Sequence, residues 1–235
     1  MIQSKKEIAP LTLILGLLFF CKPLVVFGQT MDDSQLLKSY GIKIGIASAR
    51  QSWDYNPTSS VYANSVSRNG LDIGIYGEWF NIPFLSFVSE CHYIQKGGGV
   101  SKYEDMWYTY PTWKVTFFNG YFPRVNYISV PLLAKMRINW RTFNPYILIG
   151  PRFDYSLSSN NMLAYNNIKK LDVGATMGIG VGLFSKSSIH FGAEFRYSPS
   201  FNDIYSLPSL MVADGTVSSL KIRNQSLEFL LVISY

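Results

Sequence analysis

Regular alternation of apolar and polar residues is the feature that most constrains how this chain can fold. It is clearest at the C-terminus, where the sequence ends in SLEFLLVISY and apolar residues occupy every second position from Leu227 to Tyr235. Successive side chains of a β-strand point to opposite faces, so a period of two predicts a strand with one apolar face. After the N-terminal region, no stretch offers the roughly 20 continuous apolar residues of a membrane-spanning helix.

The same alternation recurs along the whole chain. It predicts eight strands, at 39–48, 70–80, 85–93, 127–139, 145–157, 171–184, 189–197 and 226–235. The links near 81–83, 139–144 and 185–188 are tight, whereas the links 49–68, 97–124, 158–168 and 199–222 are long and rich in Ser, Asn, Tyr and Gly. Short turns at one end and long loops at the other are typical of outer-membrane barrels, in which the short turns are periplasmic.

The two faces of these strands indicate which solvent surrounds them. In a secreted β-sandwich, the alternative fold, the apolar face would point inward and the polar face would meet water. Here the apolar face carries no clear charge at the strand centres, where Lys or Arg facing mid-bilayer would cost about 2–4 kcal/mol. The polar face is rich in Gly, which fits the small interior of an eight-stranded barrel. The sequence therefore predicts an all-β, eight-stranded, antiparallel up-and-down transmembrane β-barrel with short periplasmic turns and long extracellular loops.

Charges of both signs alternate with the glycines on the polar face. Unpaired charges in a water-poor interior are costly, so we expect them to pair with one another and fill the lumen. The predicted lumen charge network consists of Glu78, Glu90, Lys135, Arg137, Arg152, Asp154, Glu194 and Arg196.

The N-terminus has the pattern of a cleavable signal peptide. Lys5 and Lys6 precede the apolar run LTLILGLLFFC, and Val26 and Gly28 then occupy the −3 and −1 positions of a cleavage site. A membrane anchor is the alternative, but the run is short and Lys22-Pro23 interrupts it. We expect a signal peptide at 1–28, a short periplasmic segment at 29–38 and the barrel at 39–235.

These features together resemble the PorT-like outer-membrane β-barrel family of Gram-negative bacteria. The resemblance is carried by the eight strands, by YISVPLLAKMRI and PYILIGPRFDY in the fourth and fifth of them, and by the aromatic C-terminus. It implies an outer-membrane location, and for some members it implies an accessory role in protein secretion. It also implies that the terminal strand is the signal read by the barrel-assembly machinery during biogenesis, the alternative being an interfacial anchor alone. The residues of this C-terminal assembly signal are Phe229, Leu231, Ile233 and Tyr235.

The sequence contains little that indicates catalysis. His92 and His190 are the only histidines, no spaced Cys/His cluster suggests zinc, and GIGVG at 178–182 lies inside an alternating strand with no helix after it. We therefore expect no enzymatic activity, no cofactor and no metal. The net charge of +6 is modest and the chain is expected to be exported, so nucleic acid is not an expected partner.

These features favour a small outer-membrane barrel with a filled lumen, which has a structural or interaction role through its extracellular loops. An accessory secretion component and a narrow porin-like channel are the alternatives, although eight strands leave little room for water. The link 97–124 is the candidate recognition loop for a protein partner, because Trp and Tyr are enriched at binding surfaces. Its candidate residues are Trp107, Tyr108, Tyr110 and Trp113. Alternatively, this segment extends the hairpin above the membrane and packs on the rim and on outer-membrane lipid or lipopolysaccharide.

Overall fold

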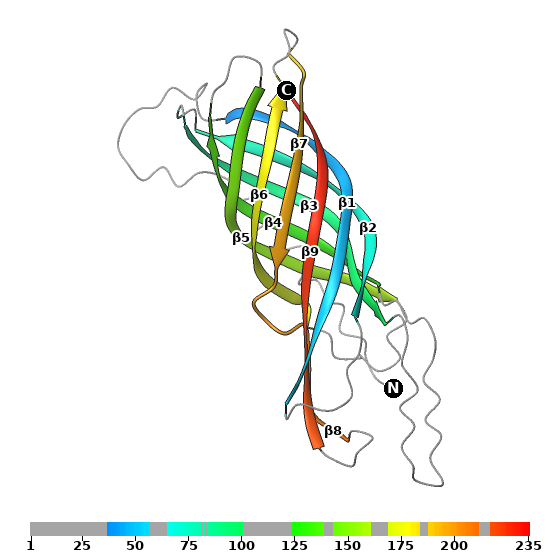
Figure 1. Cartoon of the computed structure of the whole chain (residues 1–235). Coiled ribbons are helices and arrows are strands. Elements are labelled where there is room, and N and C mark those ends of the chain that lie inside the picture. The colour runs from blue at the N-terminus through cyan, green and yellow to red at the C-terminus, as the bar shows by residue number, and fades with distance from the viewer. Residues whose placement is uncertain are drawn as a thin grey trace, which may run out of the picture. The chain divides into compact units, whose positions relative to one another are not determined.

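The computed structural model describes residues 37–56, 65–80, 82, 84–100, 124–138, 143–160, 169–183, 188–211 and 217–235. The predicted signal peptide and most of the predicted periplasmic segment lie outside these residues and stay predictions. The described residues form nine strands (Figure 1). They are β1 (Leu37–Asn56), β2 (Ser65–Trp79), β3 (Leu85–Val100), β4 (Arg124–Arg137), β5 (Phe143–Asn160), β6 (Leu171–Leu183), β7 (His190–Pro199), β8 (Tyr205–Met211) and β9 (Val217–Ser234).

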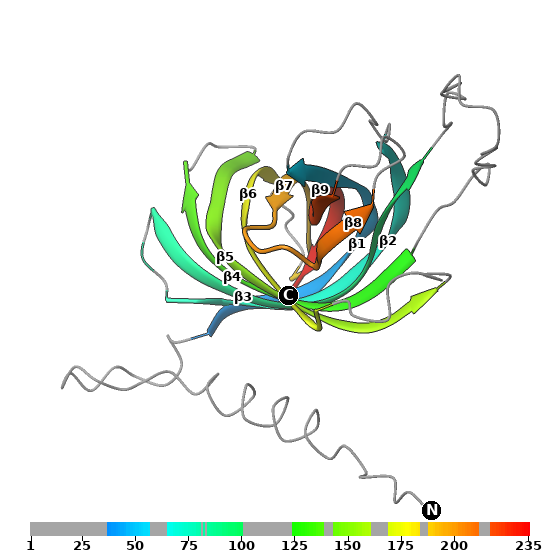
Figure 2. The ribbon, with the colours of Figure 1, turned by 90° about the horizontal axis from the view of Figure 1, so that it is seen from below.

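Eight of these strands close into an antiparallel barrel. The strand order is β1-β2-β3-β4-β5-β6-β7-β9, and β9 pairs back to β1, so that the barrel has no open edge (Figure 2). Each strand up to β7 lies beside the next one in sequence, which is the up-and-down arrangement. The predicted eight-stranded antiparallel closed barrel is confirmed.

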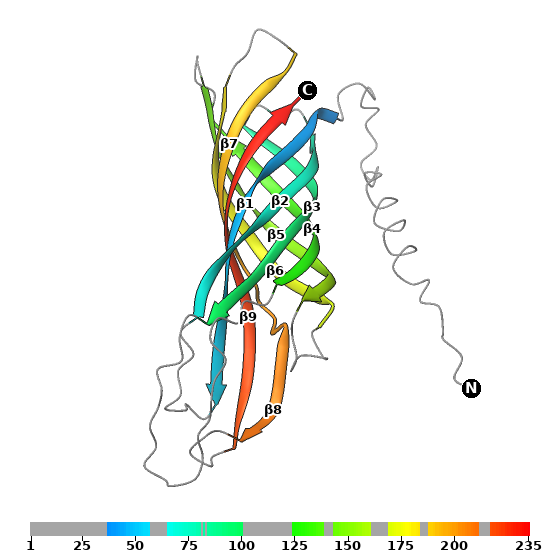
Figure 3. The same cartoon turned by 90° about the vertical axis from the view of Figure 1, so that its right-hand side faces the viewer.

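β8 is the strand that the alternation did not predict. It pairs with the first part of β9, at the end of the barrel away from the C-terminus (Figure 3). The prediction of a loop over 199–222 is therefore wrong in part, and β1 likewise continues to Asn56, which pairs with Ser219. Beyond a membrane both faces of a strand meet water, so neither face needs to be apolar and the period of two disappears from the sequence.

The outer face of the barrel is apolar and the inner face is charged. Ile44, Ile179 and Leu231 are 42–62% exposed on the outside, whereas Lys43, Arg152 and Arg196 are at most 2% exposed inside. This is the reverse of a water-soluble protein and fits a wall that faces lipid. No helix in the described part of the chain is long and apolar enough to cross a membrane.

The start of β1 and the end of β9 lie side by side where the barrel closes. The Tyr40 N–H donates to Tyr235 O at 3.1 Å, and the Tyr235 N–H donates to Tyr40 O at 2.8 Å. The two rings lie on the outside with their centroids 5.7 Å apart. We call this the short-turn end, because β2 meets β3, β4 meets β5 and β6 meets β7 there, and we call the opposite end the long-loop end.

Candidate functional site

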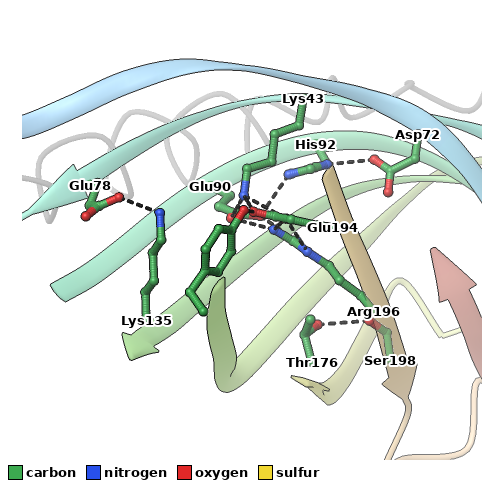
Figure 4. Close-up of polar contacts among 11 residues, drawn as sticks. Lys43, Asp72, Glu78, Glu90, His92, Lys135, Thr176, Glu194, Arg196 and Ser198 are labelled. Atoms are coloured by element: carbon green, nitrogen blue, oxygen red, sulfur yellow. Dashed lines mark hydrogen bonds and ion pairs between the residues drawn. The ribbon is translucent and has the colours of Figure 1, made fainter. Parts of the chain in front are cut away.

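The lumen holds a central charge cluster, formed by side chains of β1, β2, β3 and β7 (Figure 4). Arg196 donates through Nη1 to Glu90 Oε2 at 2.7 Å and through Nη2 to Glu90 Oε1 at 2.8 Å, a bidentate pair. Lys43 Nζ bridges Glu90 Oε1 at 2.7 Å and Glu194 Oε1 at 2.8 Å. Arg196 also pairs with Glu194, its neighbour on the same face of β7.

His92 completes this cluster, and its ring lies between two carboxylates. Its Nδ1 lies 2.6 Å from Asp72 Oδ1, and its Nε2 lies 2.9 Å from Glu90 Oε2. A carboxylate that is ionised only accepts hydrogen bonds, so with both carboxylates ionised the two ring nitrogens donate, as those of an imidazolium do. Lys43, His92 and Arg196 then balance Asp72, Glu90 and Glu194. A fourth carboxylate, Glu228, lies at the pairing position opposite Arg196 and accepts from Ser226 Oγ at 2.8 Å.

A second cluster lies at the short-turn end, where three cations surround Glu78. Lys135 Nζ lies 2.8 Å from Glu78 Oε2, and Lys38 Nζ and Arg137 Nη2 lie 3.2 and 3.0 Å from Glu78 Oε1. Ser86 Oγ also donates to Glu78 Oε1, at 2.9 Å. One carboxylate therefore faces three positive charges, an excess of two.

A third cluster lies toward the long-loop end. Asp154 Oδ2 accepts from Lys96 Nζ at 2.5 Å and lies 3.0 Å from Arg152 Nε. Asp172, opposite Asp154 in the β5–β6 pairing, accepts from Ser200 at 2.8 Å and from Asn224 at 3.1 Å. This cluster joins β3 to β5, β6 and β9, whereas the central cluster joins β3 to β1, β2 and β7.

Apolar side chains fill the lumen between these polar groups. The buried cluster consists of Tyr76, Val88, Leu133, Tyr146, Leu148 and Val232. Tyr146 ties it to the central charges, because its hydroxyl donates to Glu194 Oε1 at 2.8 Å. Lys135 Nζ lies 4.2 Å from the centre of the Tyr146 ring, a cation–π contact that ties the same tyrosine to the Glu78 cluster.

The eight residues of the predicted lumen network are thus distributed over three clusters. Glu90, Glu194 and Arg196 lie in the central one, Glu78, Lys135 and Arg137 at the short-turn end, and Arg152 and Asp154 toward the long-loop end. The predicted set left out other buried charges that these clusters contain. They are Lys43, Asp72, His92, Lys96, Asp172 and Glu228. All of them except Lys96 fall on the polar face by alternation, which was the available signal, whereas Lys96 follows the predicted end of its strand.

The other predicted sites lie elsewhere. Of the proposed assembly signal, Phe229, Leu231 and Tyr235 are 49–63% exposed on the outer wall, and Ile233 shares their face. The aromatic residues of the recognition loop, 107–113, lie outside the described residues. In the part of the chain that the structure describes, no group of three or more His, Cys, Asp or Glu side chains is arranged to hold a metal ion.

Comparison with known proteins relates this architecture to outer-membrane barrels. A family model described as "Outer membrane protein beta-barrel domain" matches residues 27–206, whereas no curated protein matches the sequence. Among solved structures, the chain is similar to the outer membrane protein OprG from Pseudomonas aeruginosa. The identity is 10%, the match covers 86% of this chain and 97% of OprG, and the TM-score is 0.54. Neisserial surface protein A matches at 15% identity over 83% of this chain and 96% of its own, with a TM-score of 0.45. The OprG likeness supports the fold.

Proposed function

This chain belongs to the outer membrane protein beta-barrel domain family, and from that premise we propose that it is a closed barrel that presents its long loops to a partner outside the membrane. It lies in the outer membrane of a Gram-negative bacterium. The proposed role is structural or one of interaction, rather than transport or catalysis. The PorT-like resemblance and the orientation with short turns in the periplasm belong to this proposal.

The Arg196–Glu90 pair is the observation that carries the closed-lumen part of the proposal. In the ring β1-β2-β3-β4-β5-β6-β7-β9, β3 and β7 are four positions apart and therefore face each other across the barrel. The bidentate contact between Glu90 on β3 and Arg196 on β7 spans the lumen. With both side chains at most 1% exposed, the contact occupies the space that a water column would need.

We expect the purified protein to show no stable conductance steps in planar bilayers. The double variant Glu90→Ala/Arg196→Ala removes the link across the lumen without leaving either partner alone, and we expect it to raise the conductance. Because its channel would still be narrow, the steps should stay small. Large, stable steps with the unmodified protein would contradict the closed lumen and support a porin-like function.

The recognition part of the proposal places the partner contact on Trp107, Tyr108, Tyr110 and Trp113. Aromatic side chains contribute large buried area at low rotamer cost, which is why they dominate the energetics of interfaces. The two described strands that flank this segment in sequence support the proposal. β3 ends at Val100 and β4 begins at Arg124, and both lie at the long-loop end.

Replacing these four residues by alanine is expected to reduce capture of the partner from cell extracts by more than about tenfold. Folding should be unchanged, as measured by membrane fractionation and by the shift in gel mobility on boiling. A matched control replaces the outward aromatics Phe195 and Phe229 of the barrel wall by leucine, which should leave capture intact. If the loop variant fails to insert, the segment is part of the barrel and the recognition proposal is wrong.

A further inference from the structure

The Glu78 cluster at the short-turn end carries more positive charge than the described residues neutralise. Glu78 is 4% exposed, and the three cations around it, Lys38, Lys135 and Arg137, are 27%, 17% and 8% exposed. Among the described residues, no other carboxylate lies within 4 Å of these cations. Counted over the part of the chain that the structure describes, the cluster thus has two more positive charges than negative ones, and it is partly open at the rim of the barrel.

Arg137 shows where an anion would be held. Its side chain is more than nine-tenths buried, and its Nη2 lies 3.0 Å from Glu78 Oε1. Even so, neither Nε nor Nη2 makes a hydrogen bond of good geometry. Buried guanidinium donors are costly to leave unsatisfied, and their planar fork matches the oxygens of a phosphate. The cluster therefore offers both the charge and the donors that a phosphate group requires.

An apolar pocket opens on the outer wall at the same strand end. It has a volume of about 760 Å³, and Arg137 is among the residues that line it. The outward side chains around it are Phe84, Met136, Ile138, Ile147, Ile179 and Phe195. At the end of β4 and in the residue after it, Lys135 and Arg137 alternate with Met136 and Ile138, so the charge cluster and the pocket lie on the two faces of one strand end.

We propose that this strand end binds an anionic phospholipid, with an acyl chain in the outer pocket and the phosphate at the rim beside Arg137 and Lys135. Charge complementarity selects an anionic headgroup, because the headgroup of a zwitterionic lipid carries a positive charge of its own, which the cations of this site would repel. The pocket selects a lipid over a soluble anion, because its outward side chains are apolar and face the membrane. Basic pockets at the membrane surface recognise lipid headgroups in the same way.

The test is native mass spectrometry of the full chain, extracted in detergent and titrated with phosphatidylglycerol or with phosphatidylcholine of the same acyl chains. We expect phosphatidylglycerol to be retained at a concentration lower by about tenfold or more. The variant Lys135→Gln/Arg137→Gln should bring the two lipids to equal retention, whereas Lys169→Gln/Lys221→Gln, which removes two charges at the long-loop end, should not. Ala193→Phe, which fills the pocket, should weaken retention of both lipids, unlike Ile44→Phe outside it.

Two further measurements keep the proposal falsifiable if the glutamine variant does not fold. Lys135→Arg/Arg137→Lys keeps both charges and should keep the preference for phosphatidylglycerol, and Ala193→Phe tests the pocket alone. Equal retention of the two lipids by the unmodified protein would overturn the proposal. So would displacement of phosphatidylglycerol by millimolar inorganic phosphate together with no effect of Ala193→Phe, because that result would show a site for a soluble oxyanion.

Discussion

Replacing Arg196 by methionine is expected to lower the free energy of unfolding of the barrel by about 3–5 kcal/mol. Arg196 contacts both Glu90 and Glu194, and all three side chains are at most 2% exposed. Methionine fills much of the same volume but leaves three carboxylates, those of Asp72, Glu90 and Glu194, with Lys43 and His92 as the two cations beside them. The central cluster would then hold an uncompensated negative charge in an interior with little water. Urea titration of the protein in lipid vesicles, followed by tryptophan fluorescence and gel mobility, measures the loss.

Two variants serve as controls, one for the position of the substituted arginine and one for the charge balance of the central cluster. Arg223→Met removes an arginine that is 45% exposed and pairs with Asp203 at the long-loop end, so its cost should be about 0–1 kcal/mol. Arg196→Met/Glu194→Gln removes one charge of each sign from the central cluster and should recover part of the stability, a coupling that the double-mutant cycle measures. If Arg196→Met unfolds at the same urea concentration as the unmodified protein, the cluster does not stabilise the barrel.

The sequence predicted the barrel well because lipid imposes a rule on every residue of a spanning strand. Where one face must be apolar, as from Leu227 to Tyr235, the period of two is visible and the strand is found. The same physics explains the failures. β8 and the first residues of β9 pair with each other beyond the barrel, where water on both sides removes the constraint. Their hydrogen bonds are between backbone groups, which carry no signal in the residue types.

The partners inside the lumen were predictable only as a set. Alternation shows that Glu90 and Arg196 both point inward, but not that β3 and β7 face each other, because that follows from the number and order of strands in the closed ring. Separation into three clusters depends on the stagger between strands, which pairs Lys96 with Asp154 near the long-loop end and Arg137 with Glu78 near the other. Lys96 was missed because its strand continues past the last apolar residue of the pattern.

Among the glycines of the inner face, which the sequence attributes to a crowded lumen, two kinds of close contact occur. At Gly180 a Cβ would lie 2.4 Å from the Tyr146 ring, so a lumen side chain occupies that space. At Gly45 a Cβ would lie 1.8 Å from the backbone oxygen of Phe229 on β9, the strand that closes the barrel against β1. A side chain can change its rotamer, but a paired backbone cannot move without loss of its hydrogen bonds. Gly45 is therefore a requirement of closure rather than of lumen volume.

Gly45→Ala is consequently expected to separate β1 from β9 and to destabilise the closed barrel by about 1–3 kcal/mol or more. Gly182→Ala is the matched control, because a Cβ at Gly182 on β6 meets its nearest atom, Asn144 O, only at 4.0 Å. The control should fold as the unmodified protein does, and both variants can be compared by the fraction that shifts in gel mobility on boiling. Hydrogen exchange should be faster along β1 and β9 in Gly45→Ala and unchanged along β4 and β5, since the clash lies at the seam. A Gly45→Ala protein with the mobility shift and exchange of the unmodified barrel would show that the seam accommodates a methyl group, and the closure argument would then fail.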